Sequence, residues 1–151
     1  MRLEHLCSMD LKYVGGFHLL KPYGNESGLG FGVGEGTASG DRLSGSVQWS
    51  NHPRRRGDGA MLPNARGVIT TRDGAEVLFD LAGRTVWVDR EGKPVGRQLL
   101  MTLFESADER YAWLNNTACM AEGVIDQATL VIHLEVHNCI SEVAERSRVS
   151  A

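Results

Sequence analysis

One histidine in the most polar loop of the chain is a candidate for acid–base chemistry. His52 lies in the segment 50–59, shortly after Trp49 and just before the arginine run 54–56. Imidazole rings change protonation near neutral pH, so a histidine can take a proton from one atom and give it to another. The alternative is an exposed loop histidine without a role, because catalysis also needs a placed partner. For the arginine run, a solvated loop is favoured over an anion site.

A glutamate at the end of an apolar strand is the second candidate. Glu105 shares its parity with Leu99, Met101 and Leu103, so these four side chains should face the same side of a sheet. If that side is the interior, the Glu105 carboxyl is desolvated and suited to act as an acid or base. The alternative is a rim residue paired with an arginine such as Arg66 or Arg110.

Rings and amides gather in the segment 109–117. We predict that Tyr111, Trp113 and Asn115 from this segment, together with Trp49, bind a ligand. Aromatic rings supply apolar contact area, and an amide can fix a ligand carbonyl or hydroxyl. The alternative, equally compatible with the sequence, is a structural corner in which Asn115 ties down loop backbone.

Two further patterns suggest cofactors but do not meet their geometric requirements. His133, Glu135 and His137 share one parity, yet two histidines four residues apart on a strand lie about 13 Å from each other, too far to bind one ion. An outward polar face is the better interpretation. The glycine-rich run 28–36 lacks the G-x-G-x-x-G spacing of a dinucleotide loop. It predicts instead a strand whose glycine face allows sharp coiling or the close approach of another backbone or a ligand.

Strands must position all of these residues. Residues 3–13 alternate apolar and polar side chains, with Leu6 as the exception, and Gly15-Gly16 predicts a bulge after which 17–20 continue the sheet. Asp73-Gly74 predicts a hairpin turn. Further strand-like runs are 43–49, 65–71, 75–81, 85–89, 98–105, 117–125 and 128–138.

These runs predict an all-β fold. We expect a single-domain antiparallel β-barrel of about eight to ten strands, calycin-like and with little helix, because closure removes exposed sheet edges. The open alternative is a two-layer sandwich. The barrel should occupy residues 1–140, followed by a polar C-terminal tail over 141–151.

Composition limits the classes of function. The chain has 151 residues, a formal net charge of −3 and 18 glycines, which is typical of one turn-rich domain and argues against a nucleic-acid binder. No apolar run approaches the length of a membrane span. Three cysteines without metal-type spacing and the lack of a signal pattern predict a reducing cytoplasm.

Several motifs resemble a known family. The segments 40–47, 71–75 and 104–105, and above all Arg110-Tyr111-Ala112-Trp113-Leu114-Asn115, are similar to the bacterial β-barrel family catalogued as domain of unknown function 3237, over roughly residues 28–137. The resemblance implies a small single-domain barrel and no established activity. In that family a Gly-Gly-Ala-Asp-Trp run falls where 45–49 stand here, so Gln48 replaces an aspartate and any acid role of that aspartate does not transfer.

The leading hypothesis is a barrel that binds a small molecule. If it is catalytic, we expect a cofactor-independent isomerase, cyclase or lyase that moves a proton on a hydrophobic or aromatic metabolite. His52 or Glu105 would move the proton, and Arg66, Tyr111 or Asn115 would stabilise an enolate-like oxygen.

Two alternatives stay open. One is a non-catalytic carrier of a small hydrophobic ligand, which a barrel supports equally well. The other is an interaction module, a homodimer or higher homo-oligomer, that buries the surface around Trp87. No cofactor, metal, nucleic acid or membrane is expected as a partner in any of the three.

Overall fold

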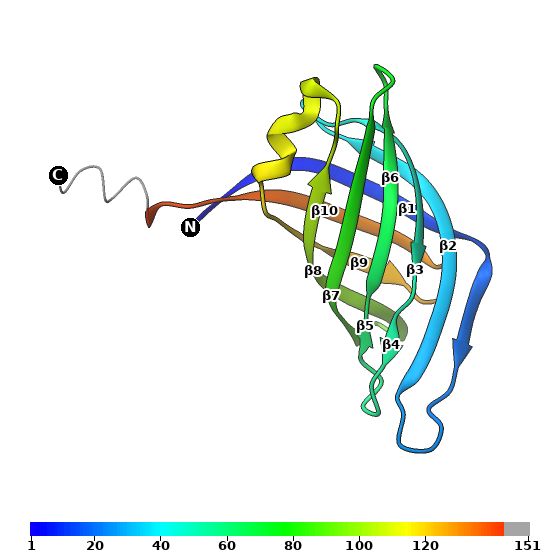
Figure 1. The fold of residues 1–151 in the computed structure, drawn as a ribbon. Coiled ribbons are helices and arrows are strands. Elements are labelled where there is room, and N and C mark those ends of the chain that lie inside the picture. The colour runs from blue at the N-terminus through cyan, green and yellow to red at the C-terminus, as the bar shows by residue number, and fades with distance from the viewer. Residues whose placement is uncertain (144–151) are drawn as a thin grey trace.

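Antiparallel strands make up almost the whole fold (Figure 1). The computed structural model describes residues 1–143. The elements are β1 (Arg2–Leu20), β2 (Gly28–Ser39), β3 (Gly45–Asn51), β4 (Arg54–Arg55), β5 (Met61–Leu62), β6 (Asn64–Thr71), β7 (Glu76–Arg90), β8 (Lys93–Glu105), the 3-10 helix η1 (Glu109–Asn116), β9 (Cys119–Asp126) and β10 (Val131–Ile140). The predicted polar tail lies outside the described residues from 144 onward.

Eight of these strands close into a ring. Neighbours follow the order β1, β10, β9, β8, β7, β6, β3, β2, and β2 pairs again with β1, each pair antiparallel. The two short strands β4 and β5 form a second link from β2 to β7 at one end of the ring. The predicted all-β antiparallel barrel is therefore confirmed, and a closed ring takes the place of the alternative sandwich.

Irregularities in β1 explain its departure from simple alternation. A register shift between His5 and Cys7 turns Leu6 inward and leaves His5 outside. A second shift falls at Gly15 and Gly16, whose φ angles of 78° and 83° suit glycine, and the strand continues beyond them as predicted. This bend lets one strand cover both the packed part of the barrel and its open end.

The glycine face of β2 makes room for aromatic rings. A Cβ added to Gly32 would meet the rings of Tyr13 and Phe17, and one added to Gly34 would lie 2.5 Å from ring carbons of Trp49. The predicted close approach of another backbone is confirmed at Gly34, where the nearest atom to such a Cβ is the carbonyl oxygen of Lys12. The sequence did not predict the approach of the rings, which belong to side chains of β1 and β3.

The helix η1 closes one end of the barrel, at the top of Figure 1, and β4 and β5 lie at the other. Asp108 caps η1 by accepting a hydrogen bond from the backbone N–H of Arg110, and Tyr111 and Leu114 are buried against the interior. The core beneath η1 is filled by side chains from most strands, among them Met9, Ile69 and Phe104. The interior beneath η1 is therefore packed.

Candidate functional site

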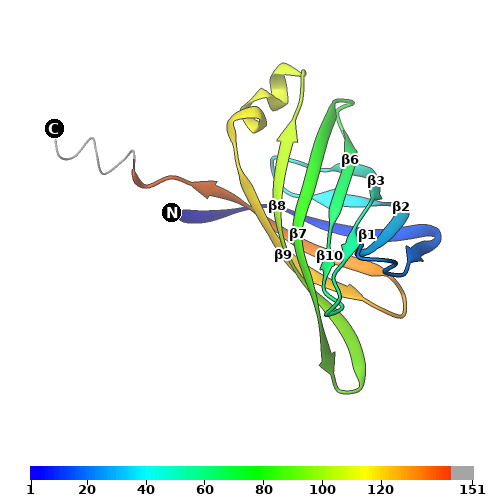
Figure 2. The same cartoon turned by 60° about the horizontal axis from the view of Figure 1, so that its bottom comes forward.

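A pocket of about 510 Å³ occupies the end of the barrel opposite η1. Its walls come from β1, β7, β8, the β9–β10 turn and the β4–β5 arm, and Figure 2 shows the β7–β8 hairpin reaching past the neighbouring strands. Phe17, Met61, Trp87, Ile125 and Leu130 make most of the lining apolar. A volume of this size and character suits a small organic molecule.

A tyrosine and an asparagine supply the first polar group in the pocket. The Nδ2 of Asn51 donates to the Tyr13 hydroxyl at 2.9 Å, while its Oδ1 accepts from the backbone N–H of Asn64 at 3.0 Å. Because the phenol oxygen accepts this bond, its own proton is free to be donated to a ligand oxygen. Burial raises the pKa of Tyr13, so the phenol stays protonated, although the Asn51 hydrogen bond offsets part of the rise.

Trp49 supports this tyrosine from the interior. The two rings meet edge to face with centroids 4.5 Å apart, and Trp49 is buried. The indole Nε1 has no hydrogen-bond partner among residues 1–143. Trp49 thus lies behind the pocket wall and fixes the Tyr13 ring.

Gln98 supplies the second polar group. Its Nε2 donates to Thr85 Oγ1 at 3.1 Å, and its Oε1 is buried in the pocket wall with no partner in the described protein. A buried acceptor left unpaired costs free energy, so such atoms in native proteins are usually satisfied by a ligand or by water. The inner wall of the pocket therefore carries a donor, the Tyr13 hydroxyl, and a buried, unpaired acceptor, Gln98 Oε1, while Arg55, Arg56 and Gln127 add further polar groups to the lining.

His52 lies outside the pocket. The side chain is exposed and contacts Phe31 and Ser50, and only its backbone N–H bonds inward, to Asn64. Asn51 and Pro53, on either side of it, both line the pocket. The alternation of a strand explains this placement, because adjacent side chains point to opposite faces.

Glu105 and Arg66 also lie on the outer surface. Leu99 and Met101, which share the parity of Glu105, are 58% and 62% exposed, so this parity faces outward and the condition for an interior Glu105 is not met. Arg66 is exposed and pairs with Asp80 at 2.9 Å. The desolvation on which a proton-transfer role for Glu105 depended is therefore absent.

The residues predicted from the segment 109–117 hold the closed end together. Asn115 accepts from the Ser106 backbone N–H at 2.8 Å and donates to the Ser106 carbonyl at 2.9 Å. Tyr111 donates to Asp73 at 2.8 Å. The geometry matches the structural corner that the sequence left open.

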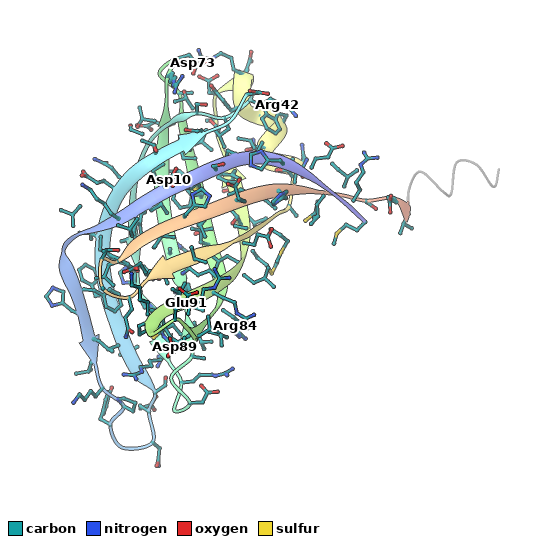
Figure 3. The ribbon with its side chains drawn as sticks, turned by 180° about the vertical axis from the view of Figure 1, so that it is seen from behind. Asp10, Arg42, Asp73, Arg84, Asp89 and Glu91 are labelled. Atoms are coloured by element: carbon teal, nitrogen blue, oxygen red, sulfur yellow. The ribbon has the colours of Figure 1, made fainter. Side chains whose placement is uncertain are left out.

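Trp113 lies at the same closed end. Its ring stacks with the guanidinium of Arg42 at 3.6 Å. Figure 3 shows Arg42 and Asp73 beside η1, so the side chains that hold η1 come from more than one neighbouring loop.

A second hollow lies beside η1. Glu105 and Asn115 line this depression of about 890 Å³ together with exposed side chains such as Glu76 and Leu78. It is shallow, and both hydrogen-bonding groups of the Asn115 amide are already used by Ser106. The smaller pocket at the open end is the better candidate, because its wall contains a buried acceptor, Gln98 Oε1, that has no partner in the described residues.

The structure also places Trp87 and the His133–Glu135 pair, for which the sequence suggested an oligomer surface and an outer polar face. Trp87, expected on an oligomer surface, lines the pocket instead. His133 and Glu135 lie on the outer surface, in agreement with an outward polar face, and they form a hydrogen bond of 2.8 Å with each other.

Within residues 1–143, no group of three His, Cys, Asp or Glu side chains is arranged to hold a metal ion. The helix in this part of the chain is too short to span a membrane.

Sequence reasoning missed Tyr13, Asn51 and Gln98. The parity of residues 9, 11 and 13 gave a signal for Tyr13, and that of 47, 49 and 51 gave one for Asn51. No such signal marks Gln98, because β8 carries apolar residues on both faces.

Comparisons with known proteins agree with this architecture. The family model described as a protein of unknown function (DUF3237) matches residues 1–137, and no curated protein matches significantly. A β-barrel-like protein of Acinetobacter baumannii is 16% identical with a TM-score of 0.81, covering 91% of this chain and 94% of that one. A protein of unknown function from Clostridium acetobutylicum is 17% identical with a TM-score of 0.80, covering 93% and 100%. An enzyme from Penicillium herquei is 20% identical with a TM-score of 0.64, covering 89% and 93%. At these identities the likeness establishes the fold.

Proposed function

The chain belongs to the DUF3237 family of proteins of unknown function, and we propose that it binds a small, largely apolar and aromatic molecule in the open end of its barrel. The observation that carries this proposal is the buried, unpaired Oε1 of Gln98 in an apolar pocket. A ligand that donates to this oxygen and accepts from Tyr13 satisfies both groups at once. The surrounding rings and aliphatic chains contribute apolar contact area.

Binding without turnover is favoured over catalysis by the side chains of the pocket. Asp58 supplies the one carboxylate among its lining residues. Hydrogen bonds from Arg56, and then from the Ala60 backbone, lower the pKa of Asp58 and make it a weak base. A carrier needs no base, whereas proton transfer does.

A second candidate is proton-transfer chemistry, and the Tyr13–Asn51 pair favours it. A protonated phenol held by an amide can donate to a carbonyl oxygen as negative charge develops there, which would assist isomerisation, cyclisation or elimination of an enolisable aromatic compound. Trp49 keeps the phenol in place.

Ligand screening with matched variants tests the proposal. The purified protein is incubated with a library of aromatic metabolites, bound compounds are identified by native mass spectrometry, and the mixture is analysed for new products by chromatography. We expect binding to weaken about fivefold or more in Gln98→Met and Tyr13→Phe, because each loses a hydrogen bond to the ligand. New products that disappear in Tyr13→Phe would favour the catalytic candidate.

The controls are His52→Ala and Glu105→Gln, whose side chains lie outside the pocket. Both should bind like the parent protein. Loss of binding in these two variants, with Gln98→Met unaffected, would disprove the pocket assignment.

The cysteines bear on the compartment. Cys7, Cys119 and Cys139 are free, and burial raises the pKa of the Cys7 thiol to about 12, which keeps it unreactive. Free thiols are stable in a reducing compartment, which supports our proposal of a cytoplasmic protein.

A further inference from the structure

Arg55, at the rim of the pocket, has a guanidinium group without a partner in residues 1–143. Arg55 lines the pocket and is half-buried, and it makes no hydrogen bond or ion pair through its side chain within residues 1–143. The pairing of Arg55 with Gly28 of β2 and with Met61 of β5 places its strand, β4, at the mouth of the pocket.

The two neighbouring arginines are engaged elsewhere. Arg54 is exposed and donates to Ser27 at 3.2 Å. Arg56 donates hydrogen bonds to both carboxylate oxygens of Asp58, at 3.1 and 2.6 Å. Because Asp58 is the one carboxylate that lines the pocket, no carboxylate of the lining is left to pair with Arg55. The mouth thus keeps a net positive charge in a chain whose formal net charge is −3.

Resting on the function proposed above, we propose that Arg55 binds an anionic group of the ligand, so that the ligand class is an aromatic organic acid. A carboxylate, sulfonate or phenolate would meet the guanidinium at the rim while the ring system enters the apolar interior. Arginine suits this role because its planar fork can donate two parallel hydrogen bonds to one acid group. Beside an apolar wall the attraction is stronger than in bulk water.

Two fluorescent probes that differ in charge test this proposal. Anilinonaphthalene sulfonate is an anionic aromatic molecule, and phenylnaphthylamine is a neutral relative of similar shape. We expect the parent protein to bind both, and Arg55→Met to weaken the anionic probe about tenfold while leaving the neutral probe unchanged. Arg54→Met, the matched control, should change neither titration.

Each outcome separates this proposal from the function on which it rests. If neither probe binds, the pocket itself is not a ligand site. If the neutral probe binds but Arg55→Met leaves the anionic probe unaffected, the anion subsite is wrong and the pocket stands. Met101→Lys, on the outer surface, should alter neither probe. If it removes the anionic probe while Arg55→Met does not, the probe binds the outer surface and the subsite is wrong.

A separate observation concerns the outer face of the sheet. Apolar side chains on β7 and β8 are about half exposed or more, namely Leu78 at 58%, Leu99 at 58%, Met101 at 62% and Leu103 at 49%. Ala82 and Met120 flank Met101 on the neighbouring strands and extend the surface sideways. Charged residues lie beside the leucines, since Arg84 and Glu122 pair with Leu99 and Asp80 pairs with Leu103, so the apolar surface is a row along β8 that widens only at Met101. An exposed apolar row of this length is typical of a contact site.

The charges at its two ends complement each other. The outward residues of β8 run in the order Arg97, Leu99, Met101, Leu103, Glu105, with the charged pair about 26 Å apart. Neither Arg97 nor Glu105 forms a hydrogen bond or ion pair through its side chain within the described part of the chain. A two-fold axis across β8 at Met101 would place Met101 on its own copy, Leu99 on Leu103, and Arg97 on Glu105.

From this pattern we infer that a second copy of the chain covers the face, with the two β8 strands antiparallel. A two-fold interface uses the same surface on both subunits, so its sequence must be self-complementary, as that of β8 is. The apolar centre would exclude water, and the end charges would set the register.

Sedimentation equilibrium with charge-swapped variants tests the inference. The parent should be a dimer at micromolar concentration, and Met101→Lys should be a monomer because it buries two charges at the axis. R97E should weaken the dimer about tenfold or more, since like charges then face each other at both ends, and the double variant R97E/E105R should restore it. The control Val131→Lys, an exposed apolar residue of β10, should stay dimeric. A monomeric parent, or a dimer insensitive to Met101→Lys, would overturn the inference.

Discussion

At the scale of single residues, a chain of acid and imidazole groups crosses the outer face of β1 and β10. Asp10 bonds to His133 Nδ1 at 2.7 Å, His133 Nε2 to Glu135 at 2.8 Å, and Glu135 to His5 at 2.6 Å. Figure 3 shows Asp10 on β1, next to β10. The hydrogen bonds with Asp10 and then with Glu135 raise the pKa of His133. Bonding from Ser8, and then from the histidines, lowers the pKa of Glu135 to about 2.

These shifts predict how stability depends on pH. The folded-state pKa of His133 lies above its ordinary value of 6.5, so its contribution is complete below that pH and is lost as pH rises through the folded pKa. Between about pH 6 and 8 the parent should therefore lose stability relative to His133→Gln. Since His133 and its partners are largely exposed, the difference should stay near 0.2–1 kcal/mol, roughly the range of solvent-screened pairs.

Urea denaturation at a series of pH values measures this difference. His137→Gln is the matched control, because no hydrogen bond from its ring is formed in the described structure. The interpretation fails if His133→Gln and the parent show the same pH dependence. For Glu135 the sign is opposite, since its contribution is complete above its ordinary value of 4.5 and is lost as pH falls toward 2.

At the scale of elements, β2 gives the clearest link between sequence and packing. A Cβ on Gly34 would collide with Trp49 and, more closely, with the carbonyl oxygen of Lys12 on the paired strand. Gly34→Ala should therefore lower the free energy of unfolding by about 1–3 kcal/mol, the usual cost of overpacking. Denaturant titration followed by tryptophan fluorescence measures this loss.

The neighbouring residue supplies the control for that variant. Glu35 is exposed, and its carboxylate lies 3.7 Å from Lys12 Nζ, so Glu35→Ala should change stability by less than about 0.5 kcal/mol. If Gly34→Ala also changes the free energy of unfolding by less than about 0.5 kcal/mol, the Trp49 ring and the Lys12 carbonyl can move away from the added methyl group. The argument for tight packing at this glycine would then be wrong.

At the scale of the whole molecule, the barrel combines a closed ring with a short arm. The eight ring strands are held by ladders of seven or more paired residues, whereas β4 and β5 contain two residues each and pair through a few bonds. Local opening should therefore be easier at the arm than in the ring. Ligand entry would then need movement of the arm alone.

Hydrogen exchange tests this difference. Backbone amides of residues 54–62 should exchange at least about tenfold faster than those of β9 and β10, and a bound ligand should slow the arm selectively. The tip of the β6–β7 hairpin, residues 72–74, is a control that should not respond. Uniform slow exchange over the arm and ring would contradict a mobile mouth.

The sequence was sufficient to determine the class of fold. Alternating side chains, the Asp73-Gly74 turn and the paired glycines of β1 all depend on local geometry, so strands, hairpin and bulge could be predicted from residues close together in the chain. The Tyr-Ala-Trp-Leu-Asn motif identified the family, which the match over residues 1–137 confirms. The same motif did not reveal that these side chains serve the closed end.

Only the tertiary structure decided which face of each strand lines the pocket. On β8 both parities are apolar, because one faces the core and the other forms an exposed surface, so alternation could not place Glu105 outside or Gln98 inside. In the same way, Asn51 and His52 are adjacent in the sequence, yet the side chain of Asn51 faces the pocket and that of His52 faces the exterior. The direction of a side chain relative to the interior depends on pairings between distant strands, which a local pattern does not contain.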